Sequence, residues 1–173
     1  MVTLSTAEGP ERTPDGRYVV VGGRRWRASD PHIPGPLRQE LVEELMAARR
    51  AVRAKESGAR RRVQDAKVAL GERGPRWWEP LTPGDAATRI ESATRALLRK
   101  RDGASICPSE VARIVDGADW RALMDAVRDA AIKLSGSGEL EFTQRGRRVS
   151  PPFTGPIRIV RGPGFDGVPA AED

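Results

Sequence analysis

Hydrophobic positions typical of a strand first appear in RYVVVGGRRWRA, residues 17–28. A β-branched run reaches Gly22-Gly23 and continues through arginines and a tryptophan, and a two-residue Gly-Gly connection is typical of a tight β-hairpin. The register predicted by this turn pairs Tyr18 with Arg27, Val19 with Trp26 and Val21 with Arg24. We therefore expect Arg27 to stack on the ring of Tyr18.

The pattern then changes to a helical period. Apolar side chains recur at spacings of 4, 4, 3 and 4 from Leu37 to Val52, and a second, shorter stripe runs from Val63 to Leu70. Ser57-Gly58 separates the stripes, so residues 36–71 are predicted to form a helical hairpin. One long helix through Gly58 is the alternative, because a single glycine costs only about 1 kcal/mol in a helix.

The second half predicts three helices and three strands. The helices cover about residues 86–101, a short stretch from Pro108, and a stretch from about Asp119 to 134. A hairpin over 139–149 turns at Arg145-Gly146, and a short strand follows at 157–160. This order is typical of a winged helix, a helix-turn-helix variant. Its expected core consists of Leu97, Ile114, Leu123, Met124, Val127, Leu134, Leu140 and Phe142.

The predicted fold class is therefore α+β, in two parts. Residues 16–80 form the β-hairpin plus helical-hairpin module, and residues 85–162 form the winged-helix domain. Residues 1–15 and 163–173 show no periodicity and are expected to be disordered tails. Residues 71–85 connect the two parts and carry Trp77 and Trp78, of which at least one is expected to dock on the fold.

Charge adds a preference for anionic partners. The 173 residues carry a net charge of +6, and residues 1–80 hold most of it, with 16 Lys+Arg against 11 Asp+Glu; residues 81–173 hold 14 against 13. A basic balance favours nucleic acid or a membrane surface by long-range attraction. The alternative is an arginine-rich, solvated surface without a specific partner.

The sequence also predicts the cellular compartment of the protein. No apolar run approaches the roughly 20 residues that span a bilayer, so no membrane partner is expected. MVTLSTAEGPERTPDG, at the start, has acids and prolines where a signal peptide has a basic start and an apolar block. The single cysteine provides no internal disulfide. We expect a cytoplasmic protein.

Catalytic patterns are not apparent. The only cysteine, Cys107, and the only histidine, His32, cannot build a zinc cluster, and no paired-carboxylate, Ser-His-Asp or phosphate-loop pattern occurs. In ASICPSEVAR, Pro108 suits the first position of a helix and Glu110 faces the positive end of its dipole. We therefore expect Cys107 to be a structural, mostly buried side chain, and we expect no cofactor, no metal and no enzymatic activity.

Two resemblances accompany these patterns. ICPSEVAR, DWRALMDAVRDAA, QRGRRV and GPIRIVRG, within residues ~86–161, resemble a small bacterial family described as a domain of unknown function. Residues ~15–80, with DGRYVVVGGRRWRASDP, ELMAARRAV and KVALGERGPRWW, resemble short bacterial proteins labelled Tol-type biopolymer transporters. The resemblances imply two modules and supply no activity and no catalytic residues.

Two hypotheses of function remain. In a DNA-binding winged helix the third helix enters the major groove and the wing contacts the backbone, so one hypothesis is a nucleic-acid-binding accessory protein. Its candidate contacts are Arg121 and Arg128 on the third helix, Arg145, Arg147 and Arg148 on the wing, and Arg60, Arg61 and Arg62 in the first module. The other is a protein-interaction module in which the winged helix packs on a partner protein and Trp77-Trp78 lie at a contact; Asp125 and Asp129 on the third helix favour it. Arginines of both modules on one face would favour the first hypothesis.

Overall fold

A two-stranded hairpin opens the part of the chain, residues 9–167, that the computed structural model describes. β1 (Tyr18–Val21) pairs antiparallel with β2 (Arg24–Arg27) in the predicted register. Gly22 and Gly23 have φ of 57° and 73°, a turn that side chains with a Cβ rarely adopt. On the other edge of β1, Arg12 bridges Val19, so the last residues of the predicted N-terminal tail lie along the hairpin; residues 1–8 are outside the described residues.

The hairpin arginine, Arg27, packs on the ring of Trp78 rather than on that of Tyr18. The guanidinium of Arg27 lies 5.6 Å from the Trp78 ring, Arg17 lies 5.1 Å from it, and the Tyr18 ring packs on it at 5.7 Å. The indole N–H of Trp77 donates a hydrogen bond to the Ala28 carbonyl at 3.0 Å. The prediction that the tryptophan segment docks is thus confirmed, whereas the predicted Arg27–Tyr18 stack is wrong because a larger ring occupies that side.

The helical hairpin is confirmed and the single long helix is wrong. α1 (Gly35–Arg53) and α2 (Ala59–Ala69) are separated by a turn in which Lys55 and Gly58 have φ of 58° and 73°. Two residues with left-handed backbone conformation within four positions end a helix, whereas one glycine with helical dihedral angles would not. Across the pair, Arg62 makes two hydrogen bonds of 2.9 and 3.0 Å to the buried Glu44 carboxylate.

The remaining elements have the predicted winged-helix order. They are α3 (Pro83–Lys100), α4 (Pro108–Val115), the 3₁₀ turn η1 (Trp120–Leu123), α5 (Met124–Gly136), β3 (Leu140–Gln144), β4 (Arg147–Val149), β5 (Arg158–Arg161) and the turn η2 (Phe165–Gly167). The strands form an antiparallel sheet in the order β4-β3-β5, and Ile106 bridges Ile159 before α4. The α+β class is confirmed, and the C-terminal part is winged-helix-like.

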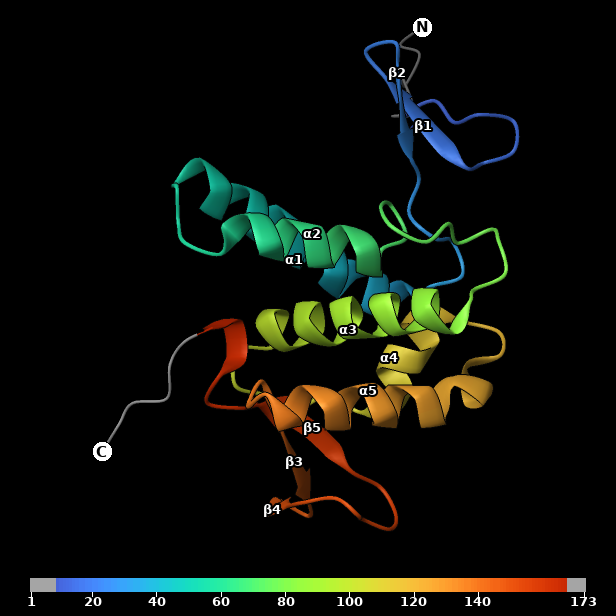
Figure 1. The fold of residues 1–173 in the computed structure, drawn as a ribbon. Coiled ribbons are helices and arrows are strands. Elements are labelled where there is room, and N and C mark those ends of the chain that lie inside the picture. Colours follow the sequence, from blue (N-terminus) through green and yellow to red (C-terminus); the bar gives the residue numbers. More distant parts are fainter. Residues whose placement is uncertain (1–8, 168–173) are drawn as a thin grey trace, which may run out of the picture.

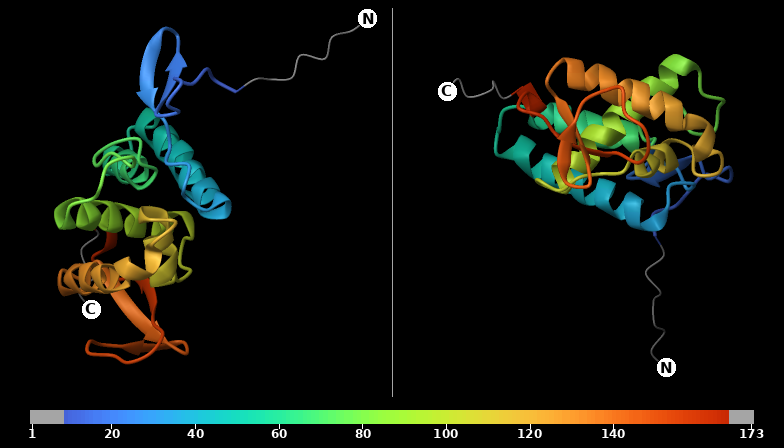
Figure 2. Two further views of the ribbon diagram at one scale, coloured as in Figure 1. Left: turned by 90° about the vertical axis from the view of Figure 1, so that its right-hand side faces the viewer. Right: turned by 90° about the horizontal axis from the view of Figure 1, so that it is seen from below.

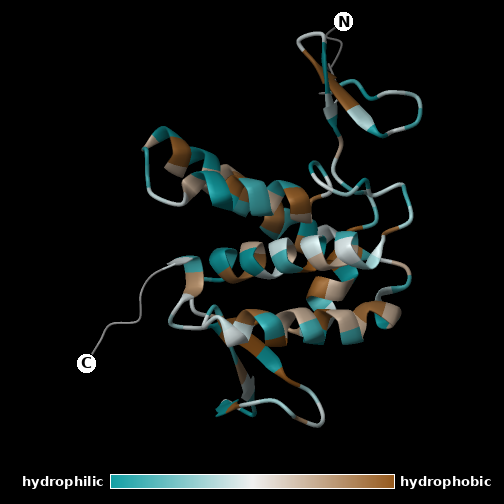
Figure 3. Ribbon diagram, viewed as in Figure 1, coloured by the Kyte–Doolittle hydropathy of each residue, from teal (hydrophilic) through white to brown (hydrophobic). Residues whose placement is uncertain are grey.

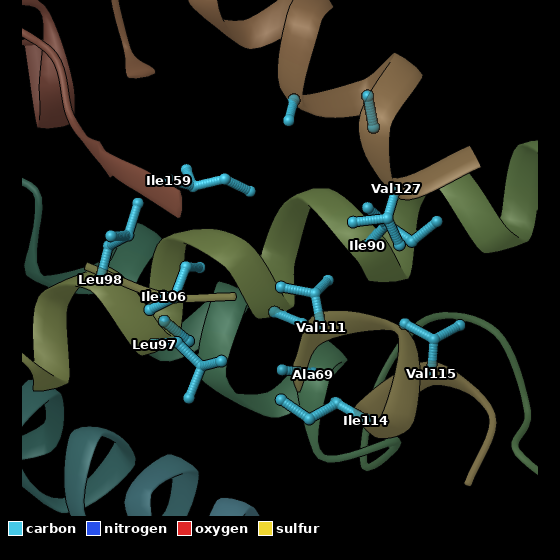
Figure 4. Packing of buried hydrophobic residues seen from close by; sticks show 14 of the residues in the cluster. Ala69, Ile90, Leu97, Leu98, Ile106, Val111, Ile114, Val115, Val127 and Ile159 are labelled. Carbon is cyan, nitrogen blue, oxygen red and sulfur yellow. The ribbon is translucent and has the colours of Figure 1, made fainter. Parts of the chain in front are cut away.

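α3 occupies the centre of the molecule. The α1–α2 pair covers one side of it, α4 and α5 cover the other, and the three-stranded sheet lies beyond α5 (Figures 1 and 2). Buried side chains of all these layers form one hydrophobic cluster, with Leu41 from α1, Leu70 at the end of α2 and Leu97 from α3 each fully buried. Figure 4 shows how Ile90 and Leu97 of α3 face residues of the neighbouring elements.

Arginines along α3 and at its end link this central helix to α1, α2, α4, η2 and two neighbouring loops. Arg89, only 1% exposed, donates to Asp30 at 2.7 Å in the loop before α1. Arg95 binds Glu139 before β3. The others bridge further: Arg99 binds Asp65 on α2 and Asp166 on η2, and Arg101, which ends the helix, binds Glu40 on α1 and Glu110 on α4. These side chains are held by carboxylates and are not available to a partner.

The core differs from the prediction at one helix start. Six of the expected core residues are buried, Leu97, Ile114, Val127, Leu134, Leu140 and Phe142, but Leu123 and Met124 are only partly buried. The reason is the 3₁₀ turn at Trp120–Leu123, which changes the angular spacing before α5 begins.

The beginning of the predicted C-terminal tail is docked on α3. Phe165 is 6% exposed and the Asp166 carboxylate pairs with Arg99 at 2.6 Å. Residues 163–167 therefore contribute to the fold, and residues 168–173 lie outside the described part of the chain.

Candidate nucleic-acid interface

The β3–β4 turn forms the wing. Gln144 pairs with Arg147 across it, and the two turn residues, Arg145 and Gly146, have φ of 48° and 77°. This turn places Arg145 and Arg147 next to each other at the tip of the hairpin. The wing lies at the end of the molecule opposite the β1–β2 hairpin (Figures 1 and 2).

The wing arginines differ in their partners. Arg145 and Arg147 are exposed and form no ion pair with any carboxylate of residues 9–167. Arg148, in contrast, donates to the Glu141 carboxylate on the neighbouring strand at 2.8 Å. Two of the three predicted wing contacts therefore present unneutralised charge to solvent.

A groove of about 1000 Å³ runs beside these arginines. Its second wall is the segment 154–158, which Gln144 fixes by donating to the Thr154 and Pro156 carbonyls at 2.7 and 3.1 Å. Arg158 lines the groove and donates to the side chain and carbonyl of Ser105. Sequence reasoning missed Arg158, although its place between Ile157 and Ile159 predicts an outward direction in a strand.

The arginines of the third helix are partly engaged elsewhere. The Arg121 guanidinium lies 4.4 Å from the Trp120 ring, which Arg113 also approaches at 4.6 Å. Arg128 donates to the Gly155 carbonyl at 3.3 Å and so joins α5 to the segment that forms the groove wall. Exposed Asp125 and Asp129 lie on the same helix. α5 therefore presents a nearly balanced surface.

The three arginines predicted in the first module are not brought to the wing. Arg62 is paired with Glu44, Arg61 lies 3.8 Å from Glu139, and Arg60 is exposed. They belong to α2, which is separated from the wing by α3 and α5 (Figure 1). The structure thus separates the candidate contacts into two regions, so the arginines of the two modules do not share the one face that would favour nucleic-acid binding over protein interaction.

Cys107 occupies the position before α4 with a partly buried side chain, which is consistent with the expected structural position at the helix start. Its Sγ lies 3.0 Å from Ser109 Oγ, and its backbone N–H donates to Glu110 Oε2 at 2.7 Å. Burial opposes ionisation of Glu110, but hydrogen bonds from Arg101 and Cys107 outweigh it and lower the pKa of that carboxyl. The only histidine, His32, contacts Asp30 instead, with 3.0 Å between Nδ1 and Oδ1.

Within residues 9–167 no group of three His, Cys, Asp or Glu side chains is arranged to hold a metal ion. In the same part of the chain no helix combines the length and apolar character needed to cross a bilayer.

Comparison with known protein families finds a match for the winged-helix part of the chain. Residues 87–162 match the family model described as "Protein of unknown function (DUF3253)". This DUF3253 match covers α3 through β5 and confirms the resemblance of residues ~86–161 to a domain of unknown function. The comparison adds nothing on residues ~15–80, whose resemblance to Tol-type proteins stays a prediction. A search of curated proteins finds no match.

Proposed function

We propose that the protein binds nucleic acid and that the wing of its DUF3253 segment contacts the phosphate backbone. The observation that supports this is the pair Arg145 and Arg147, exposed at the tip of the β3–β4 hairpin and without carboxylate partners among residues 9–167. Contacts between arginine and phosphate release counterions, which is the main source of affinity without base specificity. The proposed role is binding and not catalysis.

Few phosphate contacts follow from this geometry. Most arginines on α3 are neutralised, and α5 carries Asp125 and Asp129 beside its single arginine, Arg128. With two or three contacts, raising the salt concentration from 50 to 200 mM would weaken binding by about 10- to 40-fold, because each contact adds about 0.9 to the steepness of log K against log salt. We therefore expect weak binding with little preference for sequence.

The test is a fluorescence anisotropy titration of a labelled duplex at low salt. Arg145→Ala/Arg147→Ala should weaken binding to all duplex sequences alike, because phosphate contacts carry no base information. Arg148→Ala is the matched control on the same hairpin, since Arg148 is already paired with Glu141, and it should reduce affinity less. Equal affinities of wild type and the double variant would overturn the proposal.

A second candidate is a protein-interaction module. The outer side of α5 supports it, because Ile132 is 37% exposed there and charges of both signs surround it. Balanced charge around an apolar residue is more typical of a protein contact than of a phosphate contact. This candidate replaces the first if the wild-type protein shows no binding to duplex at low salt.

A further inference from the structure

The β1–β2 hairpin has one closed face and one open face. Cross-strand partners share a face, so Tyr18 and Arg27 lie together, and Trp78 covers them. The opposite face carries Val19, Val21 and Trp26. Figure 3 shows the hydrophobic colour of β1 on a hairpin that stands away from the helical layers.

Trp26 and Val21 are unusually exposed for their size. The indole of Trp26 is 49% exposed and Val21 is 55% exposed, and both line a groove of about 500 Å³ between the hairpin and the helices α1 and α2. An indole gains considerable free energy when it is covered. An exposed one beside an open groove therefore offers a surface to a ligand.

Cations surround this indole without matching acids. Arg12 lies beside β1, and Arg49 and Lys67 come from α1 and α2; none of them forms an ion pair with a carboxylate of residues 9–167. The Lys67 ammonium lies 5.8 Å from the Trp26 ring. The one acid of the groove, Glu72, accepts a hydrogen bond from Ser29 at 2.8 Å. Burial lowers the pKa of Lys67; the Glu72 carboxylate opposes this shift, and the nearby Arg73 and Arg49 add to it.

The geometry points to a binding site for single-stranded nucleic acid in this groove, with a base stacked on Trp26 and phosphates held by Arg12, Arg49 and Lys67. A flat, exposed indole suits the π-face of any base, and cations on both sides of the groove suit the phosphates before and after that base. The bases of a duplex are stacked on one another and cannot offer that face. The site is separate from the wing and does not depend on the function proposed for it.

The test is a titration of labelled short oligo(dT), followed by fluorescence anisotropy. Trp26→Ala should weaken binding by about 5- to 150-fold, which corresponds to the loss of one stacked base, and Trp26→Phe should retain part of the affinity. Arg49→Ala/Lys67→Ala should weaken binding and make the salt dependence shallower by about 1.4, because each phosphate contact with a single strand contributes about 0.7.

Controls separate this site from the wing and from a general charge effect. Arg38→Ala removes an exposed arginine of α1 outside the groove and should leave oligo(dT) binding nearly unchanged. Arg145→Ala/Arg147→Ala should affect duplex and not oligo(dT), so the two proposals can fail independently. Thermal melting of each variant shows that it is folded.

The inference would be overturned if wild-type protein did not bind oligo(dT) at low salt. Three further results would also overturn it. The first is that Trp26→Ala binds oligo(dT) as tightly as the wild type does. The second is equal competition by an unlabelled duplex, which would mean that no base is stacked. The third is equal competition by poly-glutamate, which would identify an acidic peptide as the occupant.

Discussion

Arg89 is the least exposed charged residue in the described part of the chain. It is 1% exposed and donates to Asp30 at 2.7 Å and to the carbonyls of Ala69 and Val115. Burying a charge is costly unless it is paired and hydrogen-bonded, and here each of the three guanidinium nitrogens donates to at least one acceptor. The side chain thereby fixes the loop before α1 against α3.

Arg89→Ala should lower the free energy of unfolding by about 3–5 kcal/mol, because it leaves the buried Asp30 carboxylate without its cation. Urea denaturation measures this. Arg76→Ala is the control, since Arg76 and Glu79 form an exposed pair worth about 0–1 kcal/mol. Arg89→Met/Asp30→Asn should lose less than Arg89→Ala, and a double variant that is less stable would contradict the charge argument.

Cys107→Ser should leave the melting temperature nearly unchanged. Serine is a favourable residue at the position before a helix, and the thiol is only half buried with Ser109 as its contact. Differential scanning calorimetry measures the change. A loss of several degrees would show that the thiol has a role in packing that its exposure does not predict.

At the scale of elements, regular patterns were predictable and local breaks were not. Periodicity located α1, α3 and the strands, because burial of one face imposes a period on the residues. The 3₁₀ turn at Trp120–Leu123 left no such signal, because its residues continue the apolar spacing of α5. Phe165 was missed for a related reason, since one apolar residue in a Gly-rich segment has no period.

Leu134→Ala tests the register of α5. Leu134 is 4% exposed and belongs to the central cluster, so its truncation should cost about 2–5 kcal/mol. Leu123→Ala should cost less, about 1 kcal/mol, because the side chain is only partly buried. Chemical denaturation of the two variants gives the comparison, and a larger loss for Leu123→Ala would mean that α5 packs in another register.

The ion pair between Arg95 of α3 and Glu139, next to β3, makes the free energy of unfolding depend on pH. Hydrogen bonds from Arg95 lower the pKa of Glu139 in the folded protein. A lowered folded pKa contributes stability above the unfolded value, 4.5, which is lost as the pH falls through the folded value. Urea midpoints measured above pH 4.5 and below the folded pKa of Glu139 should differ less in Glu139→Gln than in the wild type, because the variant loses less stability in acid. Identical pH profiles would show that the pair does not contribute.

At the scale of the molecule, the number of arginines overstates the charge available to a partner. The count of basic residues was readable from the sequence, but their pairing was not, because it depends on contacts such as Arg99 with Asp166 that are distant in the chain. Arg62 and Arg148 are paired, whereas Arg145 and Arg147 form no ion pair with a carboxylate of residues 9–167. The wing and the groove beside Trp26 both carry cations without ion pairs in this part of the chain, and the β3–β4 hairpin and the β1–β2 hairpin lie at opposite ends of the molecule (Figure 2).

The most direct test of the proposed function is the salt dependence of duplex binding by the wild type and by Arg145→Ala/Arg147→Ala. A plot of log K against log salt counts the phosphates that the protein neutralises, with a slope of about −0.9 for each. If both arginines contact phosphate, the slope of the double variant is shallower by about 2. Parallel lines for the two proteins, or no measurable binding of the wild type at low salt, would contradict the account.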